Sequence, residues 1–111
     1  MSFLIKNFVL AAALALPALA LAGGNPEAGK AKAAQVCGAC HGPEGNKPSA
    51  PDQPVLAGQY PDYLVKALSD YKSGKRTNPI MKGFAEQLSK QDMEDVAAWF
   101  SIQKSPLHSQ R

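Results

Sequence analysis

The sequence predicts an all-α domain of several helices, and three observations support that fold class. Segments with helix-start and helix-stop signals alternate with segments rich in proline and glycine. No run of β-branched residues is long enough to provide the strands of a sheet. Near the C-terminus, apolar residues recur with the period of a helix, at Met93, Val96, Ala97 and Phe100.

Residues 1–22 are predicted to be a cleaved signal peptide. They hold one cation, Lys6, then an apolar stretch, and they end in Ala20-Leu21-Ala22, an A-x-A cleavage site. The uncharged stretch 8–22 contains a proline and is shorter than the roughly twenty residues that a membrane-spanning helix needs. We therefore expect export to the periplasm, no stable membrane insertion of the mature chain, and a single domain over residues 23–111.

That domain carries eleven Lys and Arg against nine Asp and Glu. Because the balance is nearly even and no block of like charges occurs, the sequence predicts no nucleic-acid partner. The stability of a domain of this size is marginal without further support. We expect the mature chain to be a monomer.

The first predicted helix begins after Asn25, which is a good N-cap, with Pro26 at the first helical position and Glu27 in the first turn. This alanine-rich helix runs towards Val36. Gly29 lowers its stability relative to alanine, and a close crossing with another helix would explain the glycine.

Four prolines exclude regular helix or strand from 42–58. Pro61 then opens a second helix, which Gly74 ends. One face of this helix is apolar and consists of Leu64, Leu68 and Tyr71. Residues 77–81 are predicted to be irregular because they contain Pro79.

The last helix has the clearest signals. Ser89 is its predicted N-cap, and Asp92 occupies the capping-box position three residues later. Pro106 is predicted to stop this helix.

Residues 37–41 read Cys37-Gly38-Ala39-Cys40-His41 and contain both cysteines of the chain. Two thiols at this spacing can add to the two vinyl groups of one haem, and the histidine that follows can reach its iron. The pentad therefore predicts one covalently attached haem c, with thioethers at Cys37 and Cys40 and with His41 as the proximal iron ligand.

Three other interpretations of the cysteines fit the sequence less well. A thioredoxin-like pair would lie at a strand-to-helix junction, and the sequence offers no strands for it. A zinc site needs four ligands, but beyond the pentad only the distant His108 is available. A disulfide between Cys37 and Cys40 would close too small a loop to stabilise a domain much, and it would leave His41 unexplained.

Methionine is the candidate for the opposite side of the iron. Met1 leaves with the signal peptide, and Met93 lies on the apolar face of the last helix, where methionine usually packs in the core. Met81 lies in the predicted irregular segment, free to turn its thioether towards the iron, and is the predicted distal ligand. The alternatives are Met93 and a sixth position that is open or has another ligand. A histidine in a polar tail, such as His108, is more often solvated than ligating.

Four stretches of the chain together resemble a class I c-type cytochrome, and most closely one haem half of the dihaem periplasmic cytochromes of proteobacteria. The stretches are 25–42, Leu56-Ala57-Gly58-Gln59-Tyr60 with Tyr63-Leu64, Gly74-Lys75-Arg76-Thr77-Asn78-Pro79-Ile80-Met81, and Leu88-Ser89-x-x-Asp92 with Ala97-Ala98-Trp99-Phe100. This chain has a single pentad, so it resembles a monohaem relative.

The resemblance implies a small cytochrome c fold, with several helices around one covalently bound haem. It implies that Gly29 lies where the first helix crosses the last, against Trp99 or Phe100. It also implies that the Pro54 carbonyl accepts a hydrogen bond from the second ring nitrogen of His41; the alternative is an ordinary loop proline.

Arg76 and Asn78 resemble family positions near a haem propionate and the axial sulfur. The alternative for both residues is a solvated loop.

The function that these features predict is single-electron carriage in a respiratory or photosynthetic chain. The expected partners are redox proteins, namely a membrane-bound donor complex and a terminal oxidase or reductase. We expect no enzymatic activity, because the sequence offers no nucleophile or acid–base constellation. Alternatives are a haem with an open sixth site, which would be peroxidase-like or gas-sensing, and an electron-entry subunit of an oxidoreductase complex.

Cations gather in the segment that leads to the predicted distal ligand, and they are either a positive face for a partner or an ordinary solvated surface. They are Lys66, Lys72, Lys75, Arg76 and Lys82.

Overall fold

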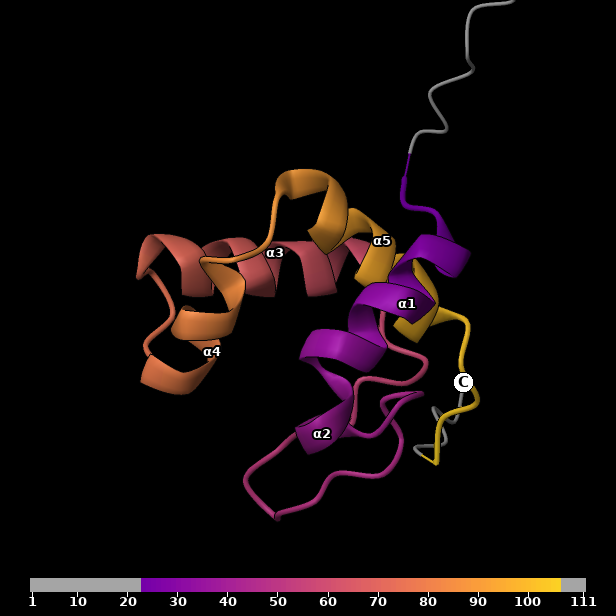
Figure 1. Ribbon diagram of the computed structural model, residues 1–111. Helices are drawn as coiled ribbons and strands as arrows, with labels where there is room; N and C mark the ends of the chain where they lie inside the picture. The colour runs from indigo at the N-terminus through magenta and orange to yellow at the C-terminus, as the bar shows by residue number, and fades with distance from the viewer. Residues whose placement is uncertain (1–22, 107–111) are drawn as a thin grey trace, which may run out of the picture.

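The computed structural model describes residues 23–106, so the predicted signal peptide and His108 lie outside the described residues. In this part of the chain all regular structure is helical (Figure 1). The helices are α1 (Pro26–Val36), α2 (Gly38–His41), α3 (Pro61–Ser73), α4 (Pro79–Ala85) and α5 (Lys90–Ser101). The predicted all-α fold class is confirmed.

Helix α1 begins where the sequence predicts. The Asn25 side-chain oxygen accepts hydrogen bonds from the backbone N–H groups of Glu27 and Ala28, at 2.9 and 3.3 Å. This cap satisfies two of the amides that a helix leaves unpaired at its start, and Pro26 follows it at the first helical position.

Helix α1 crosses α5 at very short range (Figure 1). A Cβ added at Gly29 would collide with the backbone carbonyl of Asp95 and lie 3.0 Å from the Cβ of Trp99. Next to this crossing, the Asn25 N–H donates to the buried Asp95 carboxylate at 2.8 Å, and Gln91 donates to the same oxygen. The predicted crossing at Gly29 is therefore confirmed.

The substitution Gly29→Ala tests this crossing. We expect it to lower the free energy of unfolding by about 1–3 kcal/mol, because the new methyl group must push α1 away from α5. Gly83→Ala in α4 is the matched control, since a Cβ there meets nothing within 4 Å, and it should gain about 0.5–1 kcal/mol from helix propensity. Denaturant unfolding of both variants measures the difference, and equal stabilities would contradict a close crossing.

Helix α5 supplies four of the nine buried apolar residues, more than any other helix. Its start is a capping box, in which Ser89 and Asp92 exchange side-chain-to-backbone hydrogen bonds of 3.0 Å, as predicted. The hydrogen bond from the Ser89 backbone lowers the pKa of Asp92. The predicted stripe is buried and packs against α1 and α3. The end of α5 was predicted wrongly. The helix ends at Ser101, five residues before Pro106, because the backbone there forms a turn whose hydrogen bond is accepted by the Phe100 carbonyl.

The prediction of an irregular segment over 77–81 was wrong in its second part. Residues 77 and 78 are irregular, but α4 begins at Pro79. Proline is tolerated at the first helical position, where its missing N–H would have had no helical partner. The Asn78 side-chain oxygen caps the helix by accepting from the N–H groups of Ile80 and Met81, at 3.0 and 3.1 Å. Met81 therefore lies in the first turn of a short helix.

Side chains of the described residues form only a small core. The buried apolar residues are Ala33, Ala57, Leu64, Ala85, Leu88, Met93, Val96, Ala97 and Phe100, of which four are alanines. Several large apolar side chains are exposed, namely Tyr60, Tyr63, Ile80, Phe84 and Ile102. Protein atoms alone thus bury few large apolar groups.

Candidate haem site

The pentad lies at the junction of α1 and α2. Cys37 closes α1 by donating its N–H to the Ala33 carbonyl at 2.9 Å. Its own carbonyl accepts the N–H groups of Cys40 and His41, at 3.3 and 3.1 Å. Both thiols are free and partly buried. One turn of backbone therefore presents two thiols and one imidazole together.

The environment of the first thiol argues against the thioredoxin-like interpretation. Burial raises the pKa of the Cys37 thiol to about 11, so the sulfur remains protonated at neutral pH. Redox-active C-x-x-C pairs depend on the opposite shift, which produces a reactive thiolate.

His41 is buried, with 6 % of its surface exposed, and it is oriented by a loop distant in sequence. Its Nδ1 lies 2.9 Å from the carbonyl oxygen of Pro54. A protonated Nδ1 can donate to this carbonyl, which leaves Nε2 as the nitrogen able to bind a metal. The structure thus brings together the two residues that the resemblance pairs, while the role of Pro54 towards haem stays a prediction.

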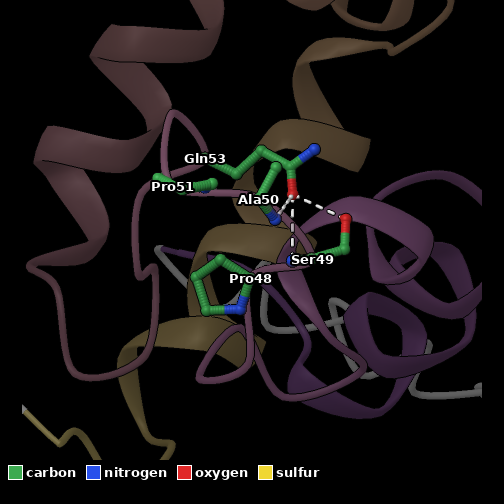
Figure 2. Close-up of a pocket in the computed structure, with 5 residues that line it drawn as sticks. All are labelled: Pro48, Ser49, Ala50, Pro51 and Gln53. Carbon is green, nitrogen blue, oxygen red and sulfur yellow. Dashed lines mark hydrogen bonds between the residues drawn. The ribbon is translucent and has the colours of Figure 1, made fainter.

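The loop that carries Pro54 is held by a side chain that the sequence analysis missed. The Gln53 side-chain oxygen accepts three hydrogen bonds, from the Ser49 N–H, the Ser49 hydroxyl and the Ala50 N–H (Figure 2). The Ser49 N–H also donates to the Cys40 carbonyl at 2.9 Å. The proline-rich composition indicates a loop, but no local pattern identifies the glutamine that organises it.

Pro48, Ser49, Ala50, Pro51 and Gln53 line a surface hollow of about 360 Å³ (Figure 2). None of the predicted iron or thioether ligands lines it.

Trp99 makes a second contact that the sequence did not indicate. Its indole Nε1–H donates to the Pro43 carbonyl at 2.9 Å, and the Lys30 ammonium lies 5.5 Å from its ring centroid. The resemblance to class I c-type cytochromes implies only packing at the Gly29 crossing for this tryptophan. The hydrogen bond ties α5 to the segment directly after His41.

The predicted distal residues come from a different part of the fold. Met81 is partly buried in α4, which packs on α3. Arg76 donates to the Tyr63 hydroxyl at 3.4 Å, and its guanidinium lies 4.8 Å from the centre of the Tyr71 ring. The hydrogen bond to Tyr63 raises the pKa of Arg76. The role of Arg76 near a propionate, and that of Asn78 near the axial sulfur, stay predictions.

Met93, the alternative ligand, is 3 % exposed in the core. Its sulfur lies 3.6 Å from the Ser69 hydroxyl. Both observations fit a packing role for this methionine.

The cations on either side of Met81 form a weaker positive face than their number suggests. Lys66 pairs with Asp70 at 2.9 Å, and Lys82 pairs with Glu86 at 3.4 Å. Lys72 donates to the Leu88 carbonyl at 2.6 Å. The two carboxylates offset part of the charge that would attract an acidic partner.

The donor set fits one covalently bound haem. Two free thiols and an imidazole with its Nδ1 already engaged lie on one turn, and the side chains of the described residues form only a small apolar core of their own. A small helical domain with this arrangement defines a haem-attachment protein of the c type.

Comparison with known proteins places the chain in a family. The family model for cytochrome c matches residues 26–102. The chain is 55% identical over 91 residues to cytochrome c4 of Pseudomonas aeruginosa, covering 82% of this chain and 44% of that protein. It is 39% identical over 80 residues to the thiosulfate dehydrogenase electron acceptor of Stutzerimonas stutzeri, covering 72% and 37%.

The crystal structure of reduced recombinant cytochrome c4 from Pseudomonas stutzeri superimposes with a TM-score of 0.69 at 47% identity, covering 77% of this chain and 48% of that one. The chain belongs to the cytochrome c family, and haem c is its cofactor. It spans about half the length of the cytochromes c4 it matches. Within residues 23–106, no helix combines the length and apolar character needed to cross a membrane.

Proposed function

We infer that this chain is a single-electron carrier that works in the periplasm between redox proteins. The observation that carries the proposal is the pentad on one helical turn, with His41 Nδ1 held 2.9 Å from the Pro54 carbonyl. Bound haem c supplies the redox chemistry through its iron. The chain's part is to attach the group, orient its ligands and bury it.

Each of these tasks has candidate residues. Cys37 and Cys40 would attach the haem through thioethers, and His41 Nε2 would bind the iron on the proximal side. Met81 would supply the sulfur ligand on the distal side. Capping of α4 by Asn78 fixes the backbone of that methionine, since the Met81 N–H itself donates to the cap.

A carrier fits better than an open-site haem enzyme, because the two proposed axial ligands, His41 and Met81, both come from the chain. Histidine–methionine ligation also raises the reduction potential relative to two nitrogen ligands. A relative named as an electron acceptor of thiosulfate dehydrogenase supports a redox protein as partner. The proposed donor is a membrane-bound complex, and the proposed acceptor is a terminal oxidase or reductase.

Two measurements on the purified protein test this proposal. A denaturing gel stained for haem should show haem on the polypeptide, because thioethers survive unfolding. The oxidised protein should show the far-red charge-transfer band of a sulfur–iron bond. A gel without stain would contradict covalent attachment, and a stained protein without the band would favour the open-site alternative.

A further inference from the structure

We propose that Gln53 is a positioning residue for the proximal histidine. Its side-chain oxygen fixes the loop so that the Pro54 carbonyl stays within hydrogen-bond distance of His41 Nδ1. This inference rests on the proposed function, because it takes His41 as the iron ligand.

The first step is the convergence of donors on one oxygen. Gln53 Oε1 accepts from the Ser49 N–H at 3.0 Å, the Ser49 hydroxyl at 2.8 Å and the Ala50 N–H at 3.0 Å (Figure 2). The Gln53 N–H returns a hydrogen bond of 3.1 Å to the Ala50 carbonyl. Gln53 and Ala50 therefore lock each other's backbone across a tight turn.

The second step is the connection to the pentad at both ends of this turn. At one end, the Ser49 N–H that reaches Gln53 also donates to the Cys40 carbonyl at 2.9 Å. At the other end, Pro54 follows Gln53 directly and accepts from His41. One end of the turn is thus hydrogen-bonded to Cys40 and the other end to His41. Gln53 connects these two ends through its hydrogen bonds to Ser49 and Ala50.

The third step is that nothing else in the turn can take over this task. Pro54 has no N–H to donate and is exposed, so its own side chain does little to hold its carbonyl in place. Within residues 50–55, the hydrogen bonds other than that of the Pro54 carbonyl all involve Gln53. The next backbone anchor is the Leu56 N–H, which donates to the Gly45 carbonyl at 2.8 Å.

The consequence concerns the electronic character of His41. A hydrogen bond from Nδ1–H to a carbonyl makes the imidazole a stronger donor to a metal and fixes its orientation. A stronger donor favours the oxidised iron. Loss of the loop geometry should therefore raise the reduction potential and open Nδ1–H to solvent.

The test is the rate at which the His41 Nδ1–H exchanges with solvent, followed by NMR on the reduced holoprotein. Gln53→Ala removes the acceptor for three hydrogen bonds, so we expect exchange to become at least about tenfold faster and the potential to rise. Gln53→Glu keeps a side-chain oxygen at the same reach, so its exchange rate should stay close to that of the unsubstituted protein. The new charge of Gln53→Glu changes the potential by itself, so only exchange is compared for that variant.

Gln59→Ala is the matched control, because Gln59 Oε1 accepts only the neighbouring Tyr60 N–H, at 2.8 Å, and has no link to Pro54. Its exchange rate and potential should not change. An unchanged rate in Gln53→Ala, or an equal rise in Gln59→Ala, would overturn the positioning role of Gln53. These results would leave the proposed function intact. If the unsubstituted protein itself held no histidine-ligated haem, the proposed function would fail together with the role of Gln53, so the two failures are distinguishable.

Discussion

Replacing Met81 by alanine is expected to abolish the far-red band of the oxidised protein and to lower the reduction potential by a large step. The thioether is the proposed sulfur ligand, and its removal leaves the sixth position open to water or to added small ligands. Absorption spectra of the oxidised form and potentiometric titration measure both effects. Helix α4 should persist in this variant, because alanine is a better helix former than methionine and the Asn78 cap uses the backbone N–H.

Met93→Leu is the matched control for this substitution. It exchanges one core side chain for another of similar volume, so we expect a cost below about 1.5 kcal/mol and an unchanged far-red band. If Met81→Ala keeps the band while Met93→Leu loses it, α5 supplies the ligand and the assignment is wrong. If both keep it, sulfur is not its source, and the open-site alternative gains over the carrier.

The double substitution of Cys37 and Cys40 by alanine is expected to leave a largely unfolded chain. Four of the nine buried apolar residues are alanines, and several large apolar side chains are exposed, so the polypeptide alone supplies a small core. Small domains often need such a core to be completed by a covalent or metal-containing group. Circular dichroism should show weak helix content, and limited proteolysis should cut throughout the chain.

The holoprotein treated with the same protease under the same conditions is the control for this experiment, and it should remain intact. A cooperative thermal transition with native-like helix content in the double variant, without haem, would show that the polypeptide folds by itself.

Local signals predicted the starts of α1 and α5 correctly. Asn25 and Ser89 act through amides two or three residues away, so a short stretch of sequence contains the whole interaction. The same signal was present before α4, where Asn78 and Pro79 repeat the Asn-Pro pair of α1. Treating the second proline as a breaker instead of a first helical residue produced the error.

Contacts between distant segments could not be predicted in this way. The hydrogen bond from Trp99 to the Pro43 carbonyl spans 56 positions, and the function of Gln53 depends on how a proline-rich loop folds back. Neither residue type nor spacing determines such pairings. The crossing at Gly29 could be anticipated, because a glycine inside a helix lowers helix stability relative to alanine and a close approach of another helix explains its presence.

The contact between α1 and α5 joins the two ends of the domain, since the Asn25 N–H reaches the Asp95 carboxylate across 70 positions. Such a contact forms only when almost the whole domain is available, and contacts of large sequence separation slow folding because the chain must close a long loop to make them. Its closure entropy grows only with the logarithm of the intervening length, at about 0.6 kcal/mol for each doubling. The segments between the two helices can therefore change in length at little thermodynamic cost, whereas one methyl group added at Gly29 already forces the two helices apart.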